Sequence, residues 1–217
     1  MSTKETVKRY ILFIISLFFA ALGVAITKHG ELGVSPISSV ANVMSSRIAS
    51  LSLGVWLIIW NCLLIVGQII ILKKDFQPIQ LLQFPLSFLF GIFTDFGMWC
   101  MSYIPVPYYG VRVLLVLGGI VMLGFGISLS VIANVIMNSG EAFVKAISDK
   151  SGIRFGNIKT GFDIVCVAVS IVLSLLLFEG RIVGTREGTV LTALLTGLVV
   201  NFFVKRISSP VNSVLSD

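Results

Sequence analysis

Long runs of hydrophobic residues, each followed by a short polar turn, dominate this chain. Residues 10–27, 53–72 and 113–138 contain no charged side chain. Each run approaches or exceeds the roughly 20 residues that a helix needs to span a hydrocarbon core about 30 Å thick. Three further runs contain few charges, at residues 76–107, 160–178 and 188–204. Because the alternation typical of a β-barrel is absent, the pattern predicts an all-α, polytopic membrane protein with about six transmembrane helices.

Two short polar segments interrupt the hydrophobic pattern, at residues 34–47 and 138–150. The first contains Ser35-Pro36-Ile37-Ser38-Ser39 near its start, and the second opens with Asn138-Ser139-Gly140-Glu141. Both stretches carry residues that cap helix N-termini. The segments are too short and too polar to span a bilayer as lipid-facing helices. They are therefore predicted to be two short re-entrant helices, or half-helices, that enter and leave on the same side.

The two halves of the chain repeat each other. Matching positions lie about 102 to 106 residues apart: Gly23 with Gly126, Gly54 with Gly156, Asn61 with Asp163, and Gly91 to Asp95 with Gly197 to Asn201. Each half then has a long helix, a short polar segment and two more helices. Three crossings are an odd number, so the second half must be inverted relative to the first. The prediction is two inverted three-helix repeats, residues 1–108 and 109–217, forming one membrane domain.

Composition and charge agree with a membrane protein. The chain is 56% hydrophobic and only 12% charged, far from the mix of a soluble domain. Eleven of the 16 Lys and Arg residues fall in segments that are on the inside if the N-terminus is inside. The net charge of +6 then follows from topology and anionic lipid, without a nucleic-acid partner. We expect both termini to be cytoplasmic, and the first hydrophobic run to be a retained helix rather than a cleaved signal.

The two short segments also supply the candidate binding site. A helix N-terminus carries partial positive charge and free N–H groups, so two of them pointing inward favour an anion or a carboxylate group. The candidate solute-binding residues are Ser35, Pro36, Ser38, Ser39, Asn61, Asn138, Ser139, Gly140, Glu141 and Asp163. The alternative is that the Ser, Asn and Pro residues simply cap surface loops.

Acidic residues inside the apolar runs are the strongest single candidates, because a charge at membrane depth is costly. Asp163 is interpreted as a coupling-ion or proton site, and the alternative is a helix-start residue paired with Lys159. Glu141 serves equally well as a first-turn partner of the helix dipole. Asp95 is interpreted as an interfacial residue at a helix end.

Motifs of soluble enzymes are absent. The chain has no P-loop, no Gly-x-Ser-x-Gly elbow and no His-Glu-x-x-His, so we expect neither an enzyme nor a cofactor. An intramembrane enzyme with an unfamiliar site stays open. The three cysteines fall inside predicted spans and are expected to be apolar packing residues.

Glycines at helix and loop junctions carry a family resemblance that covers nearly the whole chain. Gly126-Ile-Ser-Leu, the short helix 141–150, Ser151-Gly-Ile-Arg-Phe-Gly156 and Gly184-Thr-Arg-Glu-Gly-Thr189 resemble the YczE/YyaS/YitT-like family of bacterial integral membrane proteins. Many relatives show Gly-x-Gly-Pro in the polar turn, where this chain has Ile136-Met-Asn-Ser-Gly140 and Gly33-Val-Ser-Pro36. The resemblance implies a bacterial plasma-membrane protein and supplies no substrate.

Together these features predict a secondary transporter or permease for a small polar or anionic solute, with membrane lipid as surroundings and a homodimer compatible with the sequence. A non-transporting membrane accessory or scaffold protein is the main alternative, and it predicts polar turns filled by protein contacts with no central cavity. A channel is the third, and it predicts a continuous polar path with few acidic coupling residues.

Overall fold

A computed structural model describes residues 3–216 of the chain, and these residues form helices and loops without a strand. The α-helices are α1 (Thr3–His29), α2 (Pro36–Arg47), α3 (Leu53–Leu72), α4 (Gln83–Met101), α5 (Tyr109–Ala133), α6 (Ser139–Ser151), α7 (Phe155–Leu177) and α8 (Glu187–Ser216). Two 3-10 turns, Lys73–Asp75 and Pro78–Leu82, connect α3 to α4. The prediction of an all-α fold with long and short helices is confirmed.

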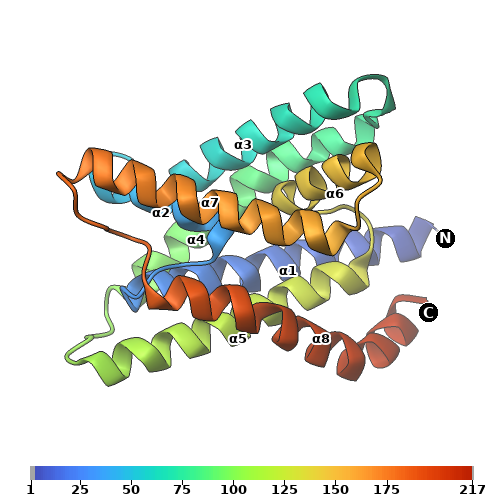
Figure 1. Ribbon diagram of the computed structural model, residues 1–217. Coiled ribbons are helices and arrows are strands. Elements are labelled where there is room, and N and C mark those ends of the chain that lie inside the picture. The colour runs from blue at the N-terminus through green and yellow to red at the C-terminus, as the bar shows by residue number, and fades with distance from the viewer. Residues whose placement is uncertain (1–2, 217) are drawn as a thin grey trace.

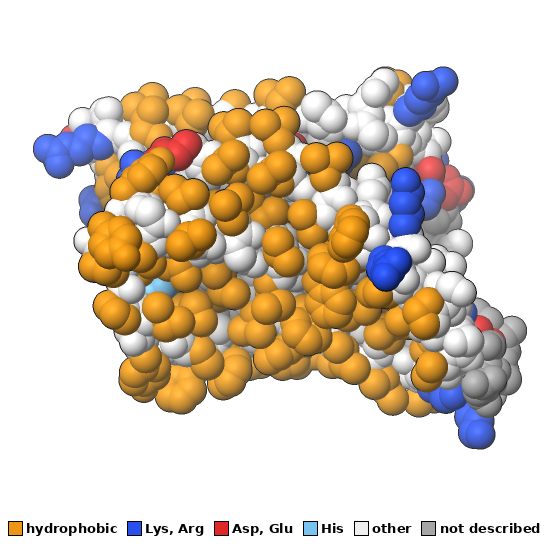
Figure 2. Space-filling model, turned by 90° about the horizontal axis from the view of Figure 1, so that it is seen from below, with side chains coloured by type: hydrophobic (Ala, Val, Ile, Leu, Met, Phe, Trp, Pro, Cys, Tyr) orange, Lys and Arg blue, Asp and Glu red, His pale blue; other side chains and the backbone are white. Residues whose placement is uncertain are grey.

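Six of the described helices, α1, α3, α4, α5, α7 and α8, are long and apolar enough to cross a membrane. Both termini lie at one end of the bundle, which we call the terminal end, and α1 finishes at the opposite, distal end (Figure 1). Hydrophobic side chains cover the middle of the surface, while Lys and Arg gather toward its two ends (Figure 2). This distribution suits a protein surrounded by lipid, so the chain is a multi-pass membrane protein.

Local chemistry sets several helix boundaries away from the edges of the hydrophobic runs. The hydrophobic run 113–138 continues past the end of α5. The helix ends at Ala133 because Asn134 adopts a left-handed conformation with φ of 48°. The hydrophobic run 76–107 starts before its helix. Pro78 opens a 3-10 turn, and α4 begins only at Gln83. Helix α8 continues past residue 204 to Ser216, with Pro210 inside it.

The centre of the bundle is the pair α1 and α5, which lie side by side (Figure 1). Small residues allow their backbones to approach closely. A Cβ atom on Gly23 would overlap Leu123, and one on Gly126 would overlap the backbone of Ala20. Helix α4 packs against α1, and α8 packs against α5, on the outside of this pair.

The short helices each pack on a long helix from the other half of the chain, α2 on α7 and α6 on α3. Helix α2 begins near the middle of α7, where the Ser39 hydroxyl donates to the Cys166 carbonyl at 3.3 Å. It then runs toward the distal end. Helix α6 runs the opposite way and ends where Lys150 pairs with Asp75 at the terminal end. The two N-termini meet, because a Cβ on Gly140 would overlap the Ile37 side chain.

Two neighbouring pairs of long helices differ sharply in how they pack. Helices α3 and α4 are in close contact, and the Gly54 and Gly91 backbones touch, so a Cβ on either glycine would overlap the other helix. Helices α7 and α8 have almost no contact with each other. In Figure 1 they run separately along the near side of the bundle. Helices α7 and α8 are therefore separated along most of their length.

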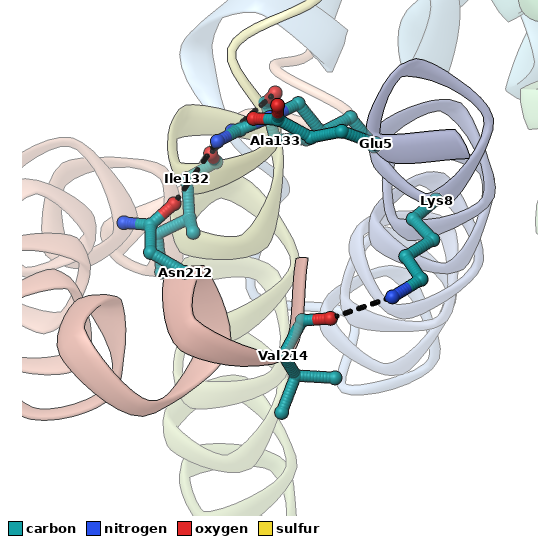
Figure 3. Close-up of polar contacts among 7 residues, drawn as sticks. Glu5, Lys8, Ile132, Ala133, Asn212 and Val214 are labelled. Atoms are coloured by element: carbon teal, nitrogen blue, oxygen red, sulfur yellow. Dashed lines mark hydrogen bonds and ion pairs between the residues drawn. The ribbon is translucent and has the colours of Figure 1, made fainter. Parts of the chain in front are cut away.

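Polar contacts join α1, α5 and α8 at the terminal end (Figure 3). The Arg9 guanidinium donates to the Ile132 carbonyl at 3.1 Å and to the Asn212 side-chain oxygen at 3.4 Å. The Lys8 ammonium donates to the Val214 carbonyl at 2.9 Å. The last turns of α8 are thereby held against the start of α1.

Candidate functional site

A cavity of about 840 Å³ lies where the N-termini of α2 and α6 meet. Its wall includes residues of α1, α3, α4, α5, α7 and α8 as well as both short helices. Apolar side chains such as Phe13, Leu57 and Phe90 form much of the wall, and polar groups gather around the two helix starts. The cavity reaches the terminal end, where the exposed side chains of Lys145 and Asp149 line it. It therefore extends from the meeting point of α2 and α6 to a polar mouth at the terminal end.

The structure brings nine of the ten predicted site residues to this one cavity: Ser35, Pro36, Ser38, Asn61, Asn138, Ser139, Gly140, Glu141 and Asp163. Ser39 is the exception. Its side chain is fully buried and bonds to the carbonyls of Pro36 and Cys166, between α2 and α7. Neighbouring residues on a helix point about 100° apart, so Ser38 can face the cavity while Ser39 packs behind it.

The start of α2 is a compact polar turn. The Ser35 hydroxyl donates to the Ser38 hydroxyl at 3.0 Å, and the Ser38 N–H donates to the Ser35 carbonyl at 3.0 Å. Pro36 occupies the first helical turn, where its missing N–H costs no hydrogen bond. The first turn of α2 contains no acidic residue. Its partial positive charge therefore faces the cavity without a carboxylate of its own helix.

The start of α6 is held by a buried polar cluster from α3 and α4. The Gln68 and Gln83 amides donate to each other's carbonyl oxygens, at 3.0 and 3.2 Å. Gln68 also donates to the Ser139 carbonyl at 3.1 Å, and the Ser87 and Ser139 hydroxyls lie 3.1 Å apart. Such satisfied networks fix geometry, so the α6 N-terminus has a defined position beside the cavity.

Charged side chains of α6 and α7 line the terminal half of the cavity. Lys159 and Asp163 form an ion pair with both carboxylate oxygens 2.5 Å from the ammonium nitrogen. This is the i, i+4 pairing anticipated as the alternative interpretation of Asp163, and it places the pair on the cavity wall. Glu141, in the first turn of α6, accepts a hydrogen bond from the Asn138 side chain and faces the charges of Lys159 and Asp163. Glu141 thus has the position expected of a helix-dipole partner.

Three cavity residues outside the predicted set, Trp60, Gln80 and Thr196, have a buried polar atom without a partner in the described part of the chain. The Trp60 indole N–H and the Thr196 hydroxyl are inaccessible to solvent and make no hydrogen bond to the described part of the chain. Both residues line the cavity, from α3 and α8 respectively. Buried polar groups are normally satisfied, so these atoms are unpaired polar positions in the cavity wall. The sequence offers little signal for either residue, because Trp60 lies in an apolar run beside Asn61 and Thr196 lies in another apolar run.

Asp95, interpreted from the sequence as an interfacial residue at a helix end, lies at the distal end of the bundle. It sits within α4, and its carboxylate accepts from the Gly54 N–H at 2.8 Å and from the Ser52 hydroxyl at 2.5 Å. Asp95 therefore caps the N-terminus of α3 and joins α3 to α4 at the distal end.

The arrangement is a polar pocket inside a helical bundle, lined by groups that can bind a small solute. Metal binding has no support in residues 3–216, which contain no group of three or more His, Cys, Asp or Glu side chains placed to hold an ion. The hydroxyls, amides and helix N-termini of the cavity supply donors, and Glu141 and Asp163 supply acceptors.

The fold and this cavity define a class, the multi-pass helical membrane proteins with an internal polar pocket. The chain belongs to the family of unknown function DUF6198, whose model matches residues 7–205. It is 28% identical over 200 residues to the uncharacterized membrane protein YczE of Bacillus subtilis (strain 168), covering 92% of this chain and 86% of that protein. The resemblance seen in the sequence is therefore confirmed. No solved structure matches the chain.

Proposed function

We propose that this protein is a secondary transporter for a small polar or anionic solute. The observation that carries the proposal is the cavity at the meeting point of the α2 and α6 N-termini, with buried donors on Trp60 and Thr196 that have no described protein partner. A solute there would be met by two helix N-termini, by hydroxyls and amides, and by the Lys159–Asp163 pair.

Paired contacts support two inverted repeats. Helix α2 packs on α7 as α6 packs on α3, and α4 packs on α1 as α8 packs on α5. The short helices run in opposite directions from a shared centre. These relations match α1–α4 with α5–α8, the same halves, 1–108 and 109–217, that the sequence repeat suggests. In transporters of this design, the binding site lies near the membrane midplane between the repeats.

The repeats differ in one respect, and this difference favours a transporter. Gly54 and Gly91 are buried in the tight α3–α4 contact at the distal end. Their counterparts Gly156 and Gly197, on α7 and α8, are exposed, and a Cβ on either would have nothing within 4 Å. The distal side is closed and the terminal side is open, as in one state of an alternating-access cycle.

The opposite state follows by exchanging the roles of the repeats. Helix α7 would close on α8 through Gly156 and Gly197, and α3 would separate from α4. Asn201 corresponds to Asp95, is exposed in this structure and lines the cavity. In the closed state the Asn201 amide oxygen would accept from the Gly156 N–H, as Asp95 now accepts from Gly54. The weaker neutral acceptor would make the terminal gate easier to open.

Asp163 is the proposed coupling residue. Its carboxylate lies on the cavity wall and is held by Lys159 at 2.5 Å. A proton, a cation or the charged group of a solute that binds there competes with this pair, so occupancy and the position of α7 become linked. Asn61 lines the same cavity from α3 and would contact the solute.

The alternatives predict other arrangements. A scaffold whose short helices only pack predicts polar turns filled by protein, and a cavity of about 840 Å³ lies there instead. A channel predicts a polar path through both ends, whereas Asp95 and the Gly54–Gly91 contact seal the distal end. We propose that the protein is not an enzyme and that it lies in a bacterial plasma membrane with both termini cytoplasmic. The weakly packed α7–α8 face leaves room for a homodimer.

Ligand screening followed by uptake tests the proposal. Purified protein is screened by thermal shift against small metabolites, since a ligand at 100 times its dissociation constant stabilises by about 2.7 kcal/mol. Hits are then offered to proteoliposomes. The proposal expects uptake by the natural protein and a large loss in Asp163→Asn and Asn61→Ala. Binding without uptake of any hit, or unchanged uptake in both variants, would refute it.

A further inference from the structure

A second pocket, of about 410 Å³, lies at the distal end, separate from the central cavity. It is formed by the end of α1, the second half of α2 and the loop between α7 and α8, and its lining includes Lys28, Asn42 and Arg186. No residue of this pocket lines the central cavity. Its chemistry is dominated by one side chain, the lysine.

Lys28 lies in the last turn of α1, but its ammonium does not bond to the free carbonyls of that helix. It donates instead to the Asn42 side-chain oxygen at 2.5 Å and to the Ser46 hydroxyl at 3.1 Å, both on α2. Both acceptors are neutral. An ammonium group has three N–H donors, so one remains for a further acceptor. The simple explanation that Lys28 neutralises the α1 dipole does not account for this geometry.

The acceptors are themselves held in place. The Asn42 amide N–H donates to the Gly184 carbonyl at 2.6 Å, which turns the amide oxygen toward Lys28. The Ser46 hydroxyl donates to the Asn42 backbone carbonyl at 2.9 Å, so its lone pairs face the ammonium. The Gly184 backbone has φ of 80° and lies so close to Asn42 that a side chain there would collide with it. The pocket is thus built around a fixed lysine.

The charge balance of the pocket is positive. Lys28 forms no ion pair within 4.0 Å among residues 3–216. Glu31 is the nearby acid, but its carboxylate pairs with Arg112 at 2.5 Å and its side chain is 63% exposed. Arg186 also lines the pocket, but its guanidinium pairs with Glu187 at 3.2 Å, so Lys28 is the cation of the wall without an acidic partner among the described residues. A partly buried cation without a carboxylate partner is a strong attractor for an anion.

We infer that this distal pocket binds a small oxyanion, a carboxylate or phosphate group, through the free donor of Lys28. The inference does not require transport, but it extends the proposed function. Ser35, Ser38 and Asn42 are spaced three and four residues apart, so they share one face of α2 from the pocket to the central cavity. The distal pocket would then be the first binding position for an anionic solute that enters from this side.

Binding measurements on the purified full-length protein in a non-ionic detergent test the inference. Titration calorimetry is done with sodium succinate and, separately, sodium phosphate, with choline chloride at matched ionic strength as the cation control. We expect saturable binding of at least one oxyanion and none of choline. Lys28→Met should weaken this binding about tenfold or more, and Lys28→Arg should weaken it less. The relative response to succinate and phosphate identifies which oxyanion the pocket prefers.

Arg47→Met is the matched control, because Arg47 ends α2 at the same end of the molecule, is exposed and does not line the pocket. It removes the same charge and should leave oxyanion binding unchanged. Oxyanion binding that Lys28→Met removes and Arg47→Met keeps belongs to the distal pocket, and binding that remains in Lys28→Met belongs elsewhere, which separates this site from the proposed transport site. Ser46→Ala is a second variant, for the case that Lys28→Met does not fold. It removes one acceptor of the Lys28 ammonium and keeps the ammonium itself, so oxyanion binding should persist. No oxyanion binding to the natural protein, or equal losses in Lys28→Met and Arg47→Met, would overturn the inference.

Discussion

The Asp95 carboxylate of α4 accepts the backbone N–H of Gly54, in the first turn of α3, at 2.8 Å. The same carboxylate accepts the Ser52 hydroxyl at 2.5 Å. The Asp95 side chain on α4 therefore satisfies a backbone N–H at the start of α3. It holds the distal ends of α3 and α4 together. The corresponding Gly156 and Asn201 in the second half are apart and exposed.

Removing the Asp95 contact should loosen the distal end. Asp95→Ala deletes a charged acceptor of a backbone N–H, a change that costs about 1–3 kcal/mol of stability. We expect lower thermal stability in detergent and faster reaction of a cysteine introduced at Ser52 with a thiol reagent. Asp75→Ala, which breaks an exposed ion pair at the opposite end, serves as the control and should change stability by about 1 kcal/mol or less.

A bulky residue at Gly197 should block closure of α7 on α8 without harming the observed state. Gly197 has open space where a Cβ would be, so Gly197→Leu is expected to fold normally. Uptake should fall strongly, because the leucine occupies the surface that α7 must approach. Gly118→Leu on α5 is the matched control, since Gly118 is equally open but is not part of the proposed gate. Equal uptake in the two variants would argue against this gate.

The two ion pairs at the cavity should differ in importance. Asp163 pairs with Lys159 and is 21% exposed, whereas Asp149 pairs with Lys145 at the mouth and is 54% exposed. Asp163→Asn should lower uptake about tenfold or more, because the partly buried Lys159 ammonium loses its carboxylate partner. Asp149→Asn should have little effect, as expected for an exposed pair. Uptake measured side by side in proteoliposomes distinguishes them, and the reverse order of effects would remove Asp163 from the site.

Close packing of α1 on α5 predicts that one glycine of α5, Gly126, does not tolerate a larger side chain and that another, Gly118, does. A Cβ on Gly126 would overlap the Ala20 backbone, so Gly126→Val forces the two helices apart and should cost about 1–3 kcal/mol or more. Gly118→Val, on the same helix with nothing within 4 Å, should be nearly neutral. Unfolding temperatures in one detergent provide the comparison. A neutral Gly126→Val would mean that the α1–α5 contact is looser than described.

The spans and the two short helices could be predicted from the sequence because lipid imposes long charge-free runs and helix starts impose capping residues. The same reasoning predicted ten site residues, and nine of them line one cavity. Ser39 packs behind the cavity wall, since a serine pair at a helix start does not reveal the rotation of that helix. The contact of Asp95 with Gly54 could not be predicted, because the two residues lie 41 positions apart in the chain.

Other features of the site depend on how distant helices pack. Thr196 belongs to an apolar run and becomes a cavity residue only because α7 and α8 are separated. Lys28 reads as an ordinary charge at a helix end until α2 brings Asn42 and Ser46 to its ammonium. The repeat in the sequence predicts equal halves, and so it cannot predict which half is closed.

The most direct test of the central claim asks from which side the cavity can be reached. Thr196→Cys is placed in a variant whose natural cysteines Cys62, Cys100 and Cys166 are replaced by alanine, and the protein is reconstituted in one orientation. A membrane-impermeant thiol reagent is then added to each side separately. We predict labelling from the terminal side and, more slowly, from the distal side, and we predict that Gly197→Leu abolishes only the distal reaction. Labelling from the terminal side alone in the protein with Gly197 would contradict it.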